Sequence, residues 1–186
     1  TEGLYQVDDF NYDASTQTYT LKDGVPYHGD KGQIRPGMWK FKNLTGDDNV
    51  IDENDKTVIG NAQPKFYGGL NNSFTYKGFD LSIFLTFSYG NEVLNATKLV
   101  TSKVGSLNYN ALDVMNSSNR WMTINTEGEK VTDPGELAVL NAGKTVAVYH
   151  DAQQGDNYIH SWAVEDASYL KLSNVTLGYT FPKNLI

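Results

Sequence analysis

The sequence predicts an all-β protein of antiparallel strands, and two observations carry this prediction. Apolar and polar residues alternate along residues 79–89, which is the period of a strand with one apolar and one polar face. Lys77 and Gly78 separate this run from a looser alternating run over residues 66–76, and a short turn of this kind joins the strands of a hairpin. We therefore expect a long antiparallel hairpin over residues 64–90.

The length of the predicted strand is informative. Ordinary strands have about five or six residues, and residues 79–89 make a strand about twice as long. At about 3.4 Å per residue and a tilt near 45°, it rises roughly 25 Å, which is the height of the apolar band of an outer-membrane barrel. Alternation does not say whether lipid or a protein core covers the apolar side, so a soluble sandwich stays open at this point.

The connections on the two sides of the hairpin differ in length. Lys77-Gly78 is a short turn, whereas residues 91–165 are weakly patterned, with helical turns expected at 94–104 and 111–115 and a short strand at 144–149. Outer-membrane barrels have short periplasmic turns and long external loops. The asymmetry favours part of a transmembrane β-barrel, with a transmembrane hairpin at 64–90 and a long extracellular loop region at 91–165.

A last barrel strand is expected over residues 168–182. Its apolar positions change phase near Ser173 and Asn174, which predicts a β-bulge or the passage of the strand from a loop into the apolar band. Pro182 cannot donate to a ladder and should end the strand.

The polar first part of the chain predicts only short elements. We expect short strands at 4–7 and 16–21 and an edge strand at 38–42. Further along the chain, residues 132–135 read as a turn.

Composition excludes several classes of protein. The chain has 186 residues, a net charge of −7 and no run of basic residues, which argues against nucleic acid as a partner. It has no cysteine, so disulfides and thiolate sites are excluded. The sequence shows no signal peptide and no apolar run of membrane-helix length. We interpret the chain as a piece of a longer protein.

An acidic loop at residues 43–55 resembles a calcium-binding loop, because calcium takes six to eight oxygen ligands and spaced carboxylates can converge on it. The candidate metal ligands are Asp47, Asp52 and Asp55. The ligand spacing is imperfect, and Asn49 looks like an insertion. A solvated acidic turn held by Asx-type hydrogen bonds, with no cofactor, is the alternative.

No catalytic constellation emerges from the sequence. His28, His150 and His160 lie in loop-like regions without metal-site spacing, and a surface role is expected for each. Glu165 and Asp166 are adjacent, so on a strand they point to opposite faces and cannot act as a catalytic pair. We expect the protein not to be an enzyme.

Four runs of sequence resemble the C-terminal part of the SusC/RagA-like TonB-dependent outer-membrane transporters of Bacteroidetes. The first is a proline-glycine turn and strand that leads through an acidic loop to an isoleucine-glycine-asparagine turn. The second is the hairpin region, the third is Asn119-Arg120-Trp121, and the fourth begins Val164-Glu165-Asp166-Ala167-Ser168-Tyr169. The resemblance covers most of residues 33–91 and 160–182. The chain departs from the family at Asn43, Thr45 and Asp48, which weakens the metal prediction.

The resemblance implies a plugged barrel of roughly twenty-two strands. Such a protein lies in the outer membrane of the bacterium as a multi-pass barrel, surrounded by lipid. It imports an oligosaccharide or peptide with energy supplied through TonB, and a SusD-like surface lipoprotein is its partner. In this family the plug domain and the TonB-contacting segment lie far upstream, so residues 1–186 would be a fragment of the barrel domain without the plug.

One alternative stays open. A mean hydropathy of −0.46 and the aromatic residues in the loops fit a soluble, β-rich carbohydrate-binding module with a calcium-loop-like site. Burial distinguishes the two hypotheses, since Ile83, Leu85 and Phe87 pack on a second sheet in a sandwich and face lipid in a barrel.

Overall fold

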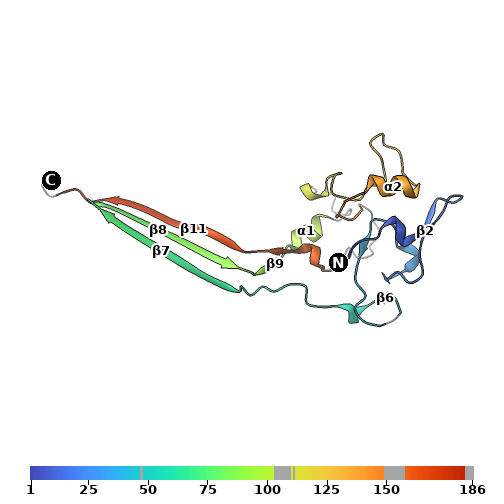
Figure 1. Ribbon diagram of the computed structural model, residues 1–186, viewed down its shortest axis with the longest axis horizontal. Coiled ribbons are helices and arrows are strands. Elements are labelled where there is room, and N and C mark those ends of the chain that lie inside the picture. The colour runs from blue at the N-terminus through green and yellow to red at the C-terminus, as the bar shows by residue number, and fades with distance from the viewer. Residues whose placement is uncertain (47, 103–109, 111, 149–157, 183–186) are drawn as a thin grey trace. The chain divides into compact units, whose positions relative to one another are not determined.

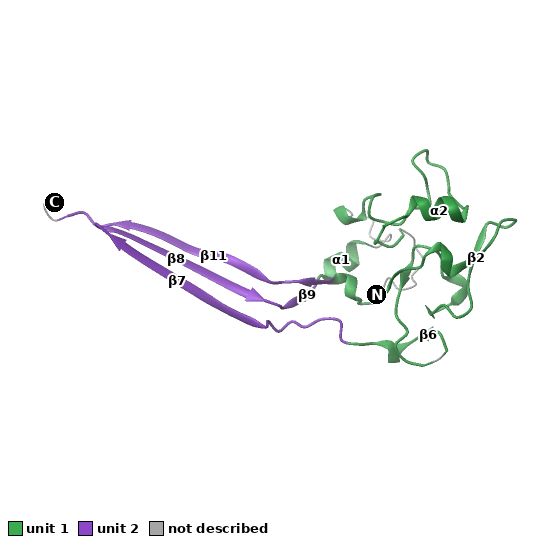
Figure 2. Cartoon of the chain, in the orientation of Figure 1, with its two compact units in different colours: residues 1–57, 95–163 green, residues 58–94, 164–186 purple. Residues whose placement is uncertain are grey.

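A computed structural model describes residues 1–46, 48–102, 110, 112–148 and 158–182 (Figure 1). The chain forms two compact units (Figure 2). Unit 1 comprises residues 1–57 and 95–163, and unit 2 comprises residues 58–94 and 164–186. Each unit is therefore built from two segments that lie far apart in the sequence.

Unit 2 contains an antiparallel sheet of three long strands, β7 (Phe66–Tyr76), β8 (Phe79–Tyr89) and β11 (Tyr169–Tyr179), in the order β11-β8-β7 (Figure 1). The turn between β7 and β8 has positive φ at both Lys77 and Gly78, as the tight turns that match strand twist require. Each strand has 11 residues. The sequence thus predicted the hairpin and the last strand to within a few residues.

The register of this sheet gathers the apolar residues on one face. In β8 the alternating positions from Phe79 to Tyr89 define that face, and their cross-strand partners in the neighbouring strands share it. In β11 the register shifts between Leu172 and Asn174, so Ser173 is the extra residue of a β-bulge. The bulge absorbs the phase change seen in the sequence and keeps apolar residues on the same face on both sides of it. The partners of the β8 residues on this face are Phe66, Gly68, Leu70, Asn72, Phe74 and Tyr76 in β7 and Leu170, Leu172, Val175, Leu177 and Tyr179 in β11.

Two glycines of β7 make room for aromatic rings of β8. A Cβ atom on Gly68 would lie 3.0 Å from the Phe87 ring, and one on Gly69 would lie 2.9 Å from the Phe84 ring on the opposite face. The rings therefore lie across bare backbone, which explains a glycine pair in the interior of a strand.

A short ribbon extends two of the long strands. β9 (Glu92–Leu94) follows β8, β10 (Val164–Asp166) precedes β11, and the two pair antiparallel. Gly90 and Asn91 on one strand, and Ala167 and Ser168 on the other, lie between the ribbon and the sheet.

Unit 1 consists of short elements. Its strands are β1 (Gly3–Leu4), β2 (Phe10–Asp13), β3 (Thr18–Leu21), β4 (Tyr27–His28), β5 (Trp39–Lys40) and β6 (Val50–Ile51). Its helices are α1 (Ala96–Thr101) and α2 (Pro134–Leu140), and its 3-10 turns are η1 (Val7–Asp9), η2 (Lys31–Gln33), η3 (Glu53–Asp55), η4 (Asp113–Met115) and η5 (Ser161–Ala163). β1 pairs with β5 and β2 with β3 antiparallel, whereas β4 and β6 pair in parallel.

The core of unit 1 joins its two segments. One buried cluster combines Leu4, Val7 and Trp39 of the first segment with Trp121, Val131, Leu137 and Ala147 of the second. A second cluster, Tyr5, Phe10, Leu21, Ile34 and Met38, comes from the first segment. Hydrogen bonds reinforce the junction, since Val148 N donates to Gly37 O at 2.8 Å and Tyr19 Oη donates to Thr132 O at 2.7 Å.

The all-β prediction is confirmed, with antiparallel pairing dominant and few helices. The strand expected at 16–21 appears as β3, but those at 4–7 and 38–42 shrink to the two-residue strands β1 and β5. The strand expected at 144–149 was wrong over its described part, where Val146 makes only an isolated bridge with Arg120. The described strands close no barrel, so the barrel stays a prediction.

The turn expected at residues 132–135 is instead the start of α2. Asp133 caps this helix by accepting hydrogen bonds from Gly135 N and Glu136 N, and Pro134 occupies its first turn. The other end is closed by Asn141, whose buried amide pairs with Met122 N and O and with Leu137 O. An aspartate followed by proline is a helix-start signal that the sequence contained.

Among the described residues, no helix has the length and apolarity needed to cross a membrane.

Candidate functional site

The most unusual surface of the described chain is the apolar face of the β7–β8–β11 sheet. Its residues are largely exposed, with 73% of Leu170, 69% of Leu177 and 58% of Phe74 accessible. Soluble monomers rarely leave apolar patches of this extent uncovered, and such patches mark sites of contact with a membrane or a partner. We call this surface the apolar sheet face, and it is the leading candidate for function.

The opposite face of the same sheet is polar. Hydroxyl and amide side chains form cross-strand hydrogen bonds there: Thr75 Oγ1 donates to Asp80 Oδ1 at 3.0 Å, and the Thr86 and Ser173 hydroxyls lie 2.7 Å apart. Phe84, whose ring lies over Gly69, is the large apolar exception in β8 that the sequence also showed, and Tyr67 and Tyr169 place aromatic rings on this face in β7 and β11. The sheet is therefore amphipathic across its two faces.

The net charge of the chain is divided unevenly between the units. The segments of unit 1 contain 18 acidic and 11 basic residues, and the segments of unit 2 contain four of each. All of the net charge of −7 thus belongs to unit 1. A sheet with an exposed apolar face and no net charge suits an apolar environment, whereas the other unit suits water.

The acidic loop predicted to bind calcium is held by hydrogen bonds from the protein. Asp55 Oδ1 accepts from Leu44 N at 2.6 Å, Thr45 N at 2.9 Å and Thr45 Oγ1 at 3.2 Å, and Asp55 Oδ2 accepts from Asp52 N at 2.8 Å. The backbone N–H of Asp52, followed by that of Leu44, holds the pKa of Asp55 below its usual value. This carboxylate joins the two ends of the loop.

Asp52 is the N-cap of η3 and accepts from Asn54 N at 2.7 Å and from Asn54 Nδ2 at 3.1 Å. Asp47 lies outside the described residues. Across the described parts of the chain, no three histidine, aspartate or glutamate side chains gather to hold a metal ion. Calcium binding at Asp47, Asp52 and Asp55 therefore stays a prediction, with donors already arranged around two of the three carboxylates.

Two of the three histidines are buried, in contrast to the surface role expected for them. His160 is 5% exposed and packs against Trp39 at 4.9 Å and Phe41 at 5.5 Å between ring centroids, and His28 lies 5.1 Å from the Phe41 ring. Burial, with the positive charges of the chain's amino terminus and Lys98, lowers the pKa of His160 to about 4. His160 is therefore a neutral core residue at pH 7. His150 lies outside the described residues.

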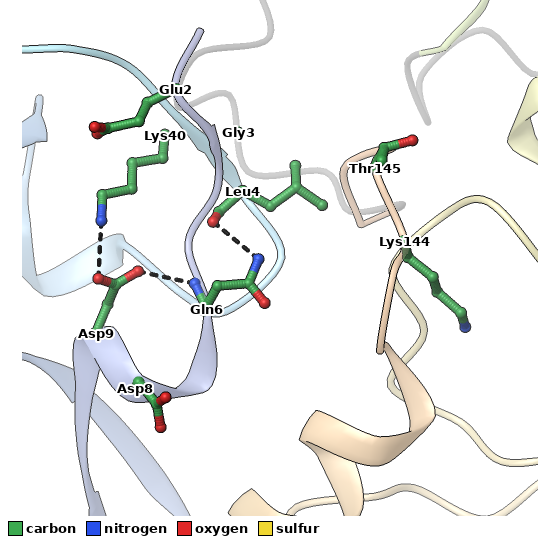
Figure 3. Close-up of a pocket in the computed structure, with 9 residues that line it drawn as sticks. All are labelled: Glu2, Gly3, Leu4, Gln6, Asp8, Asp9, Lys40, Lys144 and Thr145. Atoms are coloured by element: carbon green, nitrogen blue, oxygen red, sulfur yellow. Dashed lines mark hydrogen bonds and ion pairs between the residues drawn. The ribbon is translucent and has the colours of Figure 1, made fainter.

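Unit 1 also contains an open cavity of about 570 Å³ (Figure 3). Its polar wall is internally paired: Lys40 Nζ contacts Asp9 Oδ1 at 2.8 Å, Gln6 N donates to Asp9 Oδ2 at 2.8 Å, and Gln6 Nε2 donates to Leu4 O at 3.1 Å. Figure 3 shows the Lys144 side chain pointing away from this wall. The groups drawn do not converge on a common point, so the cavity does not define a ligand. Its lining is Glu2, Gly3, Leu4, Gln6, Asp8, Asp9, Lys40, Lys144 and Thr145.

No protein-family model matches the chain. Two curated proteins of Formosa agariphila are similar to it. The TonB-dependent receptor P39 is 26% identical over 187 residues, which cover 97% of this chain and 16% of the receptor. The TonB-dependent receptor P3 is 32% identical over 155 residues, which cover 83% of this chain and 13% of the receptor.

Both of these relatives are TonB-dependent receptors, so this is the class of protein to which the chain is similar. The chain fits a C-terminal portion of such a receptor, as the four sequence runs suggested. It spans about a sixth or less of the length of these two relatives.

Proposed function

We propose that the chain is a wall-and-loop portion of an outer-membrane TonB-dependent transporter. The apolar sheet face carries this proposal, because β7, β8 and β11 share one predominantly apolar face, interrupted by Asn72, that lipid would cover. An 11-residue strand tilted near 45° rises roughly 25 Å, which matches the apolar band of a barrel. The similarity to two TonB-dependent receptors supports the same function.

In this proposal the Lys77-Gly78 turn faces the periplasm and unit 1 is extracellular. Residues 91–165 then form the long extracellular loop region, and most of them fold together with residues 1–57 in unit 1. The uneven division of charge supports a position of unit 1 in water outside the bilayer, since unit 1 carries the whole net charge. The polar sheet face, with Asp80 and Thr86, faces the lumen or a plug.

The finer function follows the resemblance of the sequence. A SusC-like transporter imports an oligosaccharide or a peptide, receives energy through TonB, and works with a SusD-like lipoprotein on its outer surface. The chain contributes structure and contact surface to that process and no catalysis.

A soluble sandwich module is less well supported. In a sandwich the apolar residues of β8 and its neighbours would pack on a second sheet. Within the described residues, Ile83, Leu85 and Phe87 of the central strand are half-buried, and Leu70, Leu172 and Leu177 of the flanking strands are 52%, 57% and 69% exposed, so no second sheet covers this face.

A pair of neighbouring substitutions tests the proposal. Val175 lies on the apolar sheet face and Thr176 on the polar face, and both are β-branched residues of β11. In the receptor that contains this chain, we expect Val175→Lys to reduce folded receptor in the outer membrane, because a lysine facing lipid costs about 2–4 kcal/mol near the midplane. Thr176→Lys should leave it nearly unchanged. The readout is the protease-resistant receptor in isolated outer membranes.

Two results would contradict the proposal. One is an equal effect of the two substitutions. The other is folded receptor that fractionates with the soluble proteins, which would favour the soluble module.

A further inference from the structure

The long sheet of unit 2 raises a question of register. β7 and β8 are joined by a tight turn, which sets their alignment, but β11 reaches β8 only after residues 90–168. A slip of β11 by two residues would keep every apolar side chain on the apolar sheet face, because the side-chain period of a strand is two. Alternation alone therefore cannot choose among registers that differ by two.

Side-chain contacts along the two strands offer modest discrimination. The Thr86 and Ser173 hydroxyls lie 2.7 Å apart at the bulge, and the Phe79 and Tyr179 rings lie 4.5 Å apart at the far end. Most other neighbours on the apolar sheet face are exchangeable aliphatic residues, and packing on a second layer cannot help because this face is exposed.

A directional set of hydrogen bonds lies where β8 and β11 leave the sheet. Gly90 N donates to Ser168 Oγ at 2.8 Å. Ser168 in turn donates from Oγ and from N to Asp166 Oδ1 at 2.5 and 2.9 Å, and Ala167 N donates to Asn91 O at 2.9 Å. We call residues 90–91 and 166–168 the strand-exit corner.

The geometry of this corner fits one alignment. Gly90 has a φ of +78°, which favours glycine, and its N–H donates to a side chain in place of a ladder carbonyl. Beyond the corner, β9 and β10 resume pairing with Asp166 opposite Glu92. The Glu92 carboxylate also accepts from Asn61 N at 2.7 Å, so the chain entering β7 is fastened to the same place.

We propose that the strand-exit corner, through Asp166, Ser168 and Gly90, selects the register of β11 on β8. A slip of two residues moves β11 by roughly 6.8 Å along β8. That displacement carries the Ser168 hydroxyl out of hydrogen-bonding range of Gly90 N, so the corner forms in one register only. The corner thus supplies the specificity that a sheet without a covering layer lacks.

Disulfide trapping tests this inference, and the chain has no cysteine of its own. Ser82→Cys with Thr176→Cys reports the observed register, because these residues are partners. Ser82→Cys with Asn174→Cys, or with Gly178→Cys, reports a slip by two residues in either direction, since diagonal neighbours stand farther apart than a disulfide prefers. The full chain is oxidised in detergent micelles and the cross-linked fraction is measured.

With the corner intact, we expect the observed-register pair to cross-link at least about tenfold more than either slipped pair, which corresponds to about 1.4 kcal/mol. Replacing both Asp166 and Ser168 with alanine should lower that ratio about tenfold. Asp13→Ala with Ser15→Ala is the matched control, because Ser15 makes the same two bonds to Asp13 at 2.9 and 2.7 Å in the hairpin of unit 1. This control should leave the ratio unchanged.

Three outcomes would overturn the inference. The first is an unchanged ratio in the corner variant. The second is equal cross-linking of the three pairs in the parent chain, which would mean that the register is not selected. The third is loss of all cross-links in the corner variant, which would mean that the corner holds the strand itself and not its register.

Discussion

His160 shows how one residue couples burial to pH. Its neutral ring packs between Trp39 and Phe41, and its pKa falls from 6.5 to about 4 in the folded chain. Between these two pH values the unfolded chain binds a proton at this residue and the folded chain does not. Protonation therefore favours unfolding as the pH falls from 6.5 to about 4.

We predict that protonation of His160 lowers the free energy of unfolding of unit 1 by roughly 3 kcal/mol as the pH falls from 6.5 to about 4. The figure follows from about 1.4 kcal/mol for each unit by which the pKa is shifted. Urea unfolding at a series of pH values, followed by tryptophan fluorescence, measures the loss. His160→Phe keeps an aromatic ring without a titrating group and should remove this part of the pH dependence. An unchanged pH dependence in this variant would contradict the prediction.

Gly37 is a second residue whose identity is fixed by its surroundings. Its φ is +86°, and a Cβ atom would lie 2.4 Å from the ring of the buried Trp121. Gly24 has a similar φ of +82° with open space around it, which makes it a matched control.

Gly37→Ala and Gly24→Ala should both incur the backbone cost of positive φ. We expect Gly37→Ala to destabilise unit 1 by about 1–3 kcal/mol more than Gly24→Ala, because overpacking against Trp121 adds to that cost. Chemical denaturation of the two variants compares them directly. Equal losses would mean that the Trp121 ring moves aside freely.

The calcium hypothesis makes its own prediction for the acidic loop. A calcium ion bound by the native loop must raise the melting temperature relative to a sample with chelator, because a ligand of the folded state stabilises it. Asp52→Asn should abolish that increase, and magnesium should not replace calcium. A melting temperature that is the same with calcium and with chelator would remove the hypothesis.

At the scale of elements, α2 shows that a short helix depends on its ends. It has seven residues, too few to be stable without packing and caps. Asp133 satisfies two backbone N–H groups at one end, and Leu137 anchors the helix in the core.

Asp133→Ala should therefore destabilise unit 1 by about 1 kcal/mol, the usual cost of losing an N-cap. Asp113→Ala is a suitable comparison, because Asp113 is an exposed aspartate in the first turn of η4 and not its cap. We expect this second variant to change stability by less than about 0.5 kcal/mol. Similar losses for both would contradict the role assigned to the cap.

At the scale of the whole molecule, unit 1 should fold without the long sheet. Its main core combines residues of both segments, from Leu4 and Trp39 to Trp121 and Ala147. This cluster takes residues from both segments, so neither segment alone can complete it.

We predict that residues 1–57 and 95–163 form a folded unit that needs no detergent when a Gly/Ser linker joins them. A linker of about 12 residues has an r.m.s. end-to-end distance of about 20 Å. Residues 1–57 alone should not fold. Cooperative thermal unfolding, followed by circular dichroism and by tryptophan fluorescence, measures both; the joined chain contains Trp39, Trp121 and Trp162, and residues 1–57 contain Trp39. A joined chain that stays unfolded would show that the sheet is required.

The sequence by itself determined the long strands. Alternation over residues 79–89, the Lys77-Gly78 turn and the phase change at Ser173 are local signals, and the structure realises each of them as β8, the tight turn and the bulge. They could be predicted because strand periodicity and turn chemistry are properties of adjacent residues. The four motif runs likewise led to the receptor family.

Only the tertiary structure decided how the weakly patterned regions fold. Residues 95–163 lack a period of their own because they complete a core begun by residues 1–57, and contacts between distant segments leave no local signature. The burial of His28 and His160 and the bonding of Gly90 to Ser168 depend on the same long-range pairing. The physical reason is that burial and directional hydrogen bonds are set by neighbours in space, whereas periodicity is set by neighbours in sequence.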